Sequence, residues 1–385
     1  MLKQFHALFL NSTLMCHLCS YQLNSFLNRI QMRQLLTSQN LTTIAQTQQE
    51  KMSYDSLVAE FTKPTIVRIV TGCKAIATLR NEKTYNIEVF GHGSGFFVNP
   101  NGYIVTNAHV IELANKPEEC KKILMKKLQS KVRDEGENLK YLYKDLKDVE
   151  SFSKYVKLEQ FELINHVILQ NGEKLPFEAI ASDKNADSAR DVAIIKVNVK
   201  NAPALLLENS DDVLLREEVT VIGYPGVADV DRQGMSFHEP SFTDGKVSAK
   251  KYLHGSPVVQ ISAPFTHGNS GGPAVNSKGK VIGIATFYIP EYSVNPFGQQ
   301  VSGFGFIVSS NTIKDFLNLA GIVNDEGLTS KMYREGLNLY SKNRCKQAMQ
   351  KFQETKRLFS QHPSVDGFLQ ECSGYSYFQV NRPQL

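Results

Sequence analysis

The sequence predicts a mainly β protein, an antiparallel barrel or sandwich, with helices confined to one insertion and to the C-terminal end. Short runs rich in β-branched and aromatic residues follow one another from Thr65 onward, and turns containing Gly, Pro and Asn separate them. These runs do not alternate with amphipathic helices, as βαβ units would require. The 42% hydrophobic content is enough for a sizeable core.

The bulk composition excludes several classes of protein. The net charge is only +5, and no long basic run interleaves with aromatic residues, so nucleic acid is not a predicted partner. No uninterrupted apolar run reaches 18 residues, so no membrane span is predicted. A length of 385 residues allows two or three domains.

Residues 1–52 have the composition of a leader. No Asp or Glu occurs before Glu50, and apolar residues recur at helical spacing, at Leu23, Phe26, Leu27 and Ile30. Such a segment is typical of an organelle transit peptide, which would place the protein in a mitochondrion or plastid. Phe5–Cys19 could instead be a poor secretory signal, for a secreted or periplasmic protein, and the third alternative is a disordered tail. Asn11 and Asn40 begin glycosylation sequons that matter only in a secreted chain.

The six cysteines are scattered, and their spacing indicates no disulfide scaffold: Cys16, Cys19, Cys73, Cys120, Cys345 and Cys372. The first two have zinc-ligand or redox spacing, but neither a second pair nor a suitable group of histidines accompanies them. We therefore predict no metal site and no cofactor.

The expected strands come in two groups. The first comprises 65–70, 85–90, 95–98 and 103–105, with a turn at 99–102. The second comprises 165–170, 191–197, 218–225, 245–249, 258–262, 280–287 and 303–308, and a closing helix is expected over 311–319. Gly91–Gly95 resembles a phosphate-binding loop, but a strand follows it, which argues against a nucleotide site.

Residues 116–160 interrupt the strands. They are rich in charges of both signs, and their apolar residues have helical spacing. We interpret them as an insertion of one or two surface helices, which could be either a solvated spacer or a binding surface.

The stretch Thr266–Pro273 places Ser270 between small residues. Gly268 has no Cβ and can adopt a tight loop conformation that aims its own N–H and that of Ser270 at one point, as an oxyanion hole requires. The alternative is a glycine-rich turn between two strands.

A nucleophilic serine needs a base and a carboxylate that orients the base. His109 follows an expected strand, and Asp191 begins another. The chain order is therefore His, Asp, Ser. Gly268–Gly272 also satisfies G-x-S-x-G, but an α/β-hydrolase has the order Ser, Asp, His and a helix after the serine, so that fold is excluded.

With these motifs the chain resembles trypsin-like serine proteases, and among them the HtrA/Deg group. The motifs occur in the family's order: Gly93-Ser-Gly-Phe-Phe-Val, Thr106-Asn-Ala-His-Val, Asp191-Val-Ala-Ile-Ile, Val221-Ile-Gly-Tyr-Pro, Gly268-Asn-Ser-Gly-Gly-Pro and Gly303-Phe-Gly-Phe-Ile. The resemblance covers about residues 60–322 and implies two six-stranded antiparallel β-barrels over a protease domain of residues 55–325. It implies that His109 is the general base, Asp191 its partner and Ser270 the nucleophile, with Gly268 and Ser270 forming the oxyanion hole.

The resemblance also implies a substrate pocket. Pro264 would lie at its base, followed by Phe265, and Thr286, Phe287 and Tyr288 would form the opposite wall. The absence of a carboxylate among them predicts cleavage after small or medium apolar residues rather than after Lys or Arg.

The chain departs from the family after its protease domain. Residues 328–385 are too few for the PDZ domain that many HtrA proteins carry, and they are predicted to form helices. Gly336, Ala348 and Phe352 have the spacing of a tetratricopeptide repeat, although Tyr340 comes one position late. Val365–Phe378 would then be a capping helix. The alternative is an ordinary helical hairpin packed on the barrels.

The predicted function is that of a serine endopeptidase acting on unfolded or extended polypeptides, as in protein quality control. The alternatives are a chaperone-like binding protein with weak hydrolysis, and an esterase. The predicted partners are polypeptide substrates. The C-terminal helices are a candidate surface for a protein partner or for self-association into a homo-oligomer.

Overall fold

The computed structural model describes residues 52–80, 82–134, 148–185, 190–226, 238–253, 255–264, 266–286 and 305–380. The described elements belong to one compact unit, Ser53–Leu385. The predicted leader helix, the Cys16–Cys19 pair and both sequons lie outside the described residues.

The first barrel follows a short helix, α2 (Tyr54–Thr62), and a 3-10 turn, η1 (Lys63–Thr65). Its six strands are β1 (Ile66–Leu79), β2 (Thr84–Asn99), β3 (Tyr103–Thr106), β4 (Val156–Ile168), β5 (Lys174–Asn185) and β6 (Arg190–Val197). They close in the order β1-β2-β3-β6-β5-β4, and each neighbouring pair is antiparallel. Alternate residues fill the interior with an apolar cluster that includes Val67, Ile69, Phe97, Val167 and Ile195.

The second barrel has the same strand order, and most of its strands are shorter than their equivalents in the first. It comprises β7 (Glu218–Gly223), β8 (Ser241–Leu253), β9 (Ser256–Ile261), β10 (Pro273–Asn276), β11 (Val281–Thr286) and β12 (Gly305–Ser309), and the helix α5 (Ser310–Leu319) follows. The strands close as β10-β11-β12-β9-β8-β7, around Val219, Val221, Val259, Ile261 and Ile307. The two closed antiparallel barrels confirm the predicted fold.

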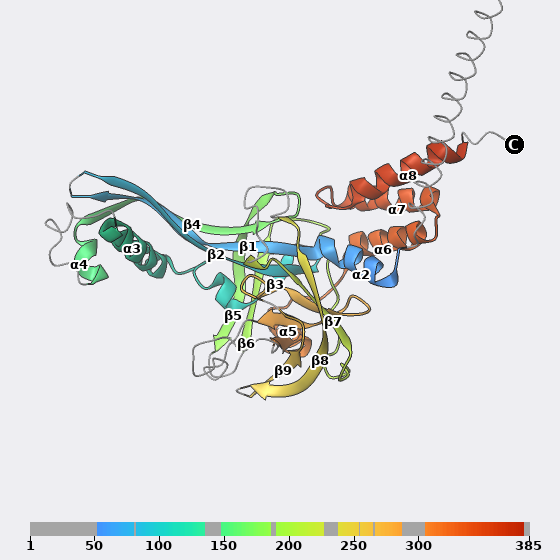
Figure 1. Ribbon diagram of the computed structural model, residues 1–385, viewed down its shortest axis with the longest axis horizontal. Coiled ribbons are helices and arrows are strands. Elements are labelled where there is room, and N and C mark those ends of the chain that lie inside the picture. Colours follow the sequence, from blue (N-terminus) through green and yellow to red (C-terminus); the bar gives the residue numbers. More distant parts are fainter. Residues whose placement is uncertain are drawn as a thin grey trace, which may run out of the picture. The chain divides into compact units, whose positions relative to one another are not determined.

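Three strands of the first barrel continue past it as an arm (Figure 1). The arm consists of residues 72–79 of β1, 84–91 of β2 and 156–165 of β4, together with α3 (Pro117–Asp134) and α4 (Val149–Ser153). One stripe of α3 is buried against this sheet, through Cys120, Leu124, Leu128 and Val132. The arm therefore has an apolar core of its own, distinct from that of the barrel.

The arm differs from the predicted insertion at 116–160 in one respect. Two helices are present, but β4 begins at Val156, within the range expected to be helical. Lys157, Gln160 and Glu162 are exposed while the other side chains between them are partly covered, and this polar outer face concealed the strand in the sequence.

Two disulfides join the four cysteines of the described residues, although the spacing of the cysteines indicated no disulfide scaffold. Cys73 of β1 is bonded to Cys120 of α3, and Cys345 is bonded to Cys372. Sequence separations of 47 and 27 give no local signal of pairing, because each bond depends on how helices pack in three dimensions.

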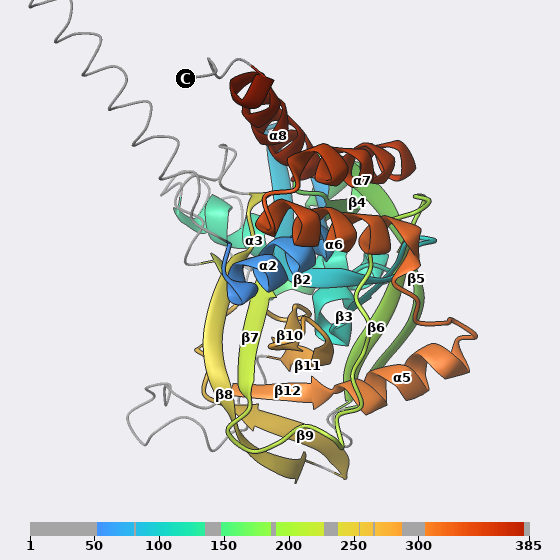
Figure 2. The same cartoon turned by 90° about the vertical axis from the view of Figure 1, so that its right-hand side faces the viewer.

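The C-terminal segment forms three helices, α6 (Gly327–Ser341), α7 (Cys345–Leu358) and α8 (Val365–Val380), and Figure 2 shows them side by side above the barrels. The tail is fastened to the first barrel. The Ser330 hydroxyl accepts a hydrogen bond from the Ala204 N–H (2.9 Å) and donates one to the Ala204 carbonyl (3.1 Å). Phe359, which follows α7, is buried in the core of the first barrel.

The predicted close approach of helices is present within the tail. A Cβ on Gly336 would lie 2.5 Å from the Phe352 ring, so only glycine fits there. Ala348 is fully buried. Assignment of the tail as a tetratricopeptide-like repeat remains a prediction.

Candidate active site

His109 lies immediately after β3, in the 3-10 turn η2 (Ala108–Ile111). Its Nδ1 is 2.5 Å from Oδ2 of Asp191, and its backbone N–H donates to Oδ1 of the same carboxylate over 2.9 Å. The two residues meet because β3 pairs with β6, where Asp191 is the second residue. Since a carboxylate only accepts hydrogen bonds, the imidazole proton belongs on Nδ1, which leaves Nε2 as an acceptor.

The Asp191 carboxylate receives a further hydrogen bond from the second barrel. The Thr286 hydroxyl, at the end of β11, donates to Oδ2 over 3.0 Å. Burial alone would raise the pKa of the Asp191 carboxyl, but the hydrogen bonds and charge of His109, with the Thr286 bond, outweigh burial and lower that pKa below its ordinary value. The Asn107 side chain also donates to the Asp191 carbonyl over 2.7 Å. Asp191 is therefore held as an oriented anion.

Ser270 lies in the connection from β9 to β10 and is 4% exposed. Gly93 brings this connection next to the His109 turn. A Cβ on Gly93 would lie 2.6 Å from a Val110 methyl group and 3.1 Å from the Ser270 carbonyl oxygen. The absence of a side chain at Gly93 thus lets the neighbour of His109 and the backbone of Ser270 pack against the same residue of β2.

Two peptide groups before Ser270 each have a carbonyl that accepts a hydrogen bond from a backbone N–H. The His267 carbonyl accepts from the Gly226 N–H over 2.9 Å, and the Asn269 carbonyl accepts from the Gly272 N–H over 2.9 Å. In a planar trans peptide the N–H points opposite to the C=O. The Gly268 N–H is therefore directed away from Gly226, and Gly268 has φ +100°, a backbone conformation that favours glycine.

The residues predicted to form a substrate pocket are only partly described. Pro264 is exposed, close to the end of β9. Thr286 is buried, and its hydroxyl is directed to Asp191 rather than serving only as a pocket wall. Phe265, Phe287 and Tyr288 lie outside the described residues.

Sequence reasoning missed two polar side chains of this site. It assigned no contact with Asp191 to Thr286, and it treated Ser94 only as a member of a motif. Ser94 is fully buried and bonded to the loop that carries Ser270. Both contacts cross from one barrel to the other, so local sequence patterns carry no signal of them.

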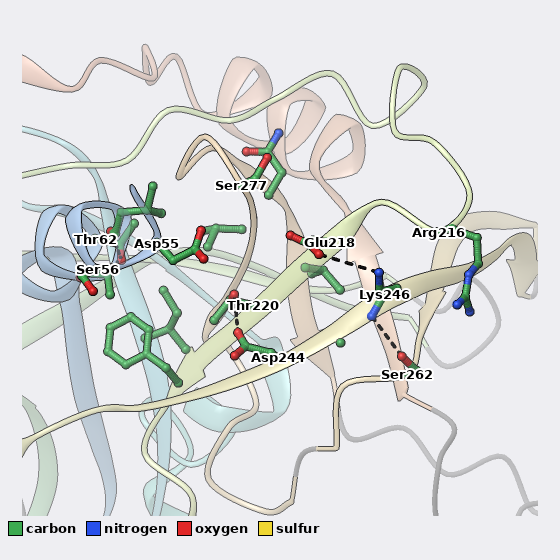
Figure 3. Close-up of a pocket in the computed structure, with 18 residues that line it drawn as sticks. Asp55, Ser56, Thr62, Arg216, Glu218, Thr220, Asp244, Lys246, Ser262 and Ser277 are labelled. Atoms are coloured by element: carbon green, nitrogen blue, oxygen red, sulfur yellow. Dashed lines mark hydrogen bonds and ion pairs between the residues drawn. The ribbon is translucent and has the colours of Figure 1, made fainter. Parts of the chain in front are cut away.

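A cavity of about 720 Å³ lies elsewhere, on the outer face of the second barrel beside α2 (Figure 3). Its lining includes none of His109, Asp191 and Ser270. Its polar groups largely satisfy one another: Thr220 donates to Asp244 over 2.7 Å, and Lys246 lies 3.7 Å from Glu218. This cavity is therefore separate from the triad candidates.

The described part of the chain contains no cluster of three or more His, Cys, Asp or Glu residues arranged to hold a metal ion. None of its helices is both long and apolar enough to cross a membrane.

Known proteins resemble the same part of the chain. Residues 93–284 match the family described as trypsin-like peptidase domain. A "Probable periplasmic serine endoprotease DegP-like" of Chlamydia pneumoniae is 30% identical over 50% of this chain and 28% of the relative. "Serine protease HTRA1A" of Danio rerio is 27% identical over 74% of this chain and 45% of the relative. The chain thus spans less than half the length of either relative.

Among solved structures, "HtrA-type protease AlgW with decapeptide" matches with a TM-score of 0.45 and 18% identity, over 70% of this chain and 67% of that chain. The strand order of the barrels, the matched peptidase domain and the named relatives agree with one another. The chain therefore carries a trypsin-like peptidase domain over residues 93–284 and is similar to serine proteases of the HtrA/Deg group.

Proposed function

We propose that the protein is a serine endopeptidase that hydrolyses extended or unfolded polypeptides through His109, Asp191 and Ser270. The observation that carries the proposal is the two-point contact of His109 with Asp191, beside the loop that holds Ser270. The match to a trypsin-like peptidase domain and the similarity to named serine proteases support it.

The geometry suggests a role for each group. The unprotonated Nε2 of His109 takes the proton of the Ser270 hydroxyl as its oxygen attacks the scissile carbonyl carbon. Asp191 stabilises the imidazolium that results, since its lowered pKa keeps it charged. The N–H groups of Gly268 and Ser270 donate to the oxyanion of the tetrahedral intermediate. His109 then protonates the leaving amine. In the second half of the reaction His109 takes a proton from water as the water attacks the acyl-enzyme, and it returns that proton to the Ser270 oxygen as the carboxylic acid product leaves.

The proposed substrate has an apolar residue before the scissile bond. The motif resemblance implies that Pro264 lies at the base of the pocket, and none of the residues that it assigns to the pocket is a carboxylate that could pair with a basic side chain. Peptides that differ only at this residue test the point. Faster cleavage after Val or Ala than after Arg is expected, and a strong preference for Arg would contradict it.

The main experiment compares wild type with Ser270→Ala. Wild type is expected to degrade unfolded casein and to react with a fluorophosphonate probe, with the label on Ser270 by peptide mass analysis. Ser270→Ala is expected to lose both activities, because the remaining groups lack a nucleophile. Ser277→Ala is the matched control, since Ser277 is exposed in the turn after β10.

Each alternative outcome has a distinct meaning. Ester cleavage without casein cleavage would favour an esterase. Casein binding by wild type and Ser270→Ala alike, without hydrolysis or labelling, would favour a chaperone-like binding protein. Full labelling of Ser270→Ala would refute the assignment of the nucleophile.

A further inference from the structure

Ser94 lies on β2 of the first barrel but makes its side-chain bonds with the second. It is fully buried, and its hydroxyl donates to the Gly268 carbonyl over 2.6 Å. The same oxygen accepts the Tyr224 N–H over 2.9 Å, at the end of β7. A Cβ on Gly223 would lie 2.7 Å from this oxygen, so the backbone of β7 approaches closely. One hydroxyl therefore links three strands or loops from two barrels.

The backbone of Ser94 is bonded to the same region. Its N–H donates to the Ser270 carbonyl over 2.8 Å, and its own carbonyl accepts from the Thr106 hydroxyl over 2.7 Å. Ser94 thus bonds the Gly268–Asn269 peptide through its hydroxyl and the Ser270–Gly271 peptide through its backbone N–H. These bonds fix the position from which its hydroxyl reaches Gly268.

The hydroxyl holds the peptide between the two oxyanion-hole candidates. The Gly268 N–H belongs to the His267–Gly268 peptide, and the Ser270 N–H to the Asn269–Ser270 peptide; backbone N–H groups hold the carbonyls of both. The intervening Gly268–Asn269 peptide is held by Ser94 through its carbonyl and by Thr266 through its N–H (3.1 Å). Rotation of this peptide would change the angle between the two donors, and glycine offers little resistance to such rotation.

We propose that Ser94 is a positioning residue of the oxyanion hole, whose hydroxyl keeps the N–H groups of Gly268 and Ser270 aimed at one point. This inference rests on the proposed function. The Ser94 hydroxyl bonds backbone groups of Gly268 and Tyr224, so its effect acts through the loop. A preorganised pair of donors stabilises the transition state more than the bound substrate, so loss of alignment lowers kcat rather than raising KM.

The test uses the full chain and the variant Ser94→Ala. Its kcat for fluorescently labelled casein is expected to fall about 10-fold to 100-fold, less than or equal to the loss of an entire oxyanion donor, with KM changed less than about threefold. Its rate constant for fluorophosphonate labelling should fall in parallel. The folded fraction is measured by thermal unfolding and used to correct kcat.

Ser330→Ala is a matched control. The Ser330 hydroxyl is equally buried and also bonds one backbone N–H and one backbone carbonyl, but it lies where the tail meets the first barrel. Its removal should lower the thermal unfolding midpoint by a similar amount, because both variants leave buried backbone groups without a partner, and it should not change kcat. Ser94→Cys keeps a weaker donor at the same atom and gives the readout if Ser94→Ala does not fold, with an intermediate kcat expected.

Every result decides the inference. If wild type is active and the kcat of Ser94→Ala stays within twofold after correction, Ser94 is merely structural and the proposed function stands. If Ser330→Ala loses kcat as strongly, the effect is general destabilisation and the inference is wrong. If wild type neither cleaves casein nor reacts with the probe, the proposed function fails, and the positioning role fails with it.

Discussion

The two barrels have the same strand order but differ in the connection from their third to their fourth strand. In the first barrel this connection runs from Thr106 to Val156 and carries His109, two helices and a disulfide partner. In the second it runs from Ile261 to Pro273 and carries Ser270 in a series of tight turns. Equivalent connections therefore supply the candidate base and the candidate nucleophile.

His109 and Ser270 are therefore held in place by different kinds of interaction. His109 is fixed at the start of its connection by the Asp191 carboxylate, and Val110 and Ile111 after it are buried in the barrel core. The rest of that connection can therefore be long without moving the base. The connection that carries Ser270 is held instead by backbone hydrogen bonds and by the Ser94 hydroxyl. Because these bonds join residues a few positions apart in tight turns, this connection has to be short.

The largest effect should come from removing the charge of Asp191, which holds His109. Asp191→Asn keeps the size of the side chain but removes the charge that, in the proposed mechanism, stabilises the imidazolium and selects the Nδ1 proton. We expect kcat/KM for casein to fall about 10⁴-fold, and the rate constant for fluorophosphonate labelling of Ser270 to fall in parallel.

Asp244→Asn is the control for this variant, because Asp244 bonds Thr220 on the outer face of the second barrel. Its activity should equal that of wild type. A loss of less than about 10-fold in Asp191→Asn would show that the carboxylate does not anchor the base.

The next effect concerns the long connection itself. Replacing Cys73 and Cys120 by serine opens a cross-link that spans 47 residues and should cost about 4 kcal/mol of unfolding free energy, measured with urea. The loss of amide protection from hydrogen exchange should concentrate in the arm, whose core is separate from that of the barrel.

Activity is the informative control for the open cross-link. It should stay within a few fold, since Val110 and Ile111 beside the base pack in the barrel cluster and not in that of the arm. A collapse of activity at full folded fraction would show that the arm, and not Asp191, fixes the base.

The short connection should respond to a single methyl group. A Cβ on Gly271 would lie 2.1 Å from the Ser94 carbonyl oxygen and 2.2 Å from the Thr106 hydroxyl, at φ +85°. Gly271→Ala is therefore expected to cost about 3 kcal/mol and to slow labelling of Ser270.

Gly255→Ala separates backbone strain from crowding. Gly255 has φ +81°, but nothing lies within 4 Å of the added Cβ, so only the strain of about 1 kcal/mol should remain. Equal losses in the two variants would mean that close packing around Ser270 contributes little.

The sequence predicted the parts of the fold that depend on local pattern. Runs of β-branched and aromatic residues separated by turn residues indicated the barrels. The residue types and their order along the chain singled out His109, Asp191 and Ser270. Their catalytic roles remain predictions that the variants test. Charged residues on the outer face of β4 hid the start of its alternation, because a half-exposed strand with many Lys and Glu resembles a surface helix.

The contacts that escaped prediction cross long separations in the chain. The Ser94–Gly268 bond joins residues 174 positions apart, and the Thr286–Asp191 bond joins residues 95 apart. A buried serine among glycines has no local signature of its acceptor. Such bonds become visible only when two barrels are placed against each other.

The smallest expected effect concerns the C-terminal tail. Phe359 and Ser330 attach this tail to the first barrel, so its stability can be compared with that of the second barrel. His362 is buried in the tail, 4.2 Å from the Tyr333 ring centroid, and burial lowers its pKa to about 3. The unfolded chain takes up a proton near pH 6.5, but the folded tail does not. Stability is therefore complete above about pH 6.5 and falls as pH decreases toward about 3, by about 2 kcal/mol at pH 5.

His362→Phe should remove this pH dependence, because phenylalanine fills a similar volume without titrating. Glu60, whose pKa is raised mainly by burial, acts on Tyr333 and works in the opposite direction in acid, so wild type and variant must be compared at the same pH. Hydrogen exchange of α6 and α7 at about pH 7.5 and 5 is the measurement. In acid the tail of wild type should open before the second barrel, and the tail of the variant should not. An equal change in the protection of α6 and α7 with pH in both proteins would mean that His362 does not cause the loss of tail stability in acid.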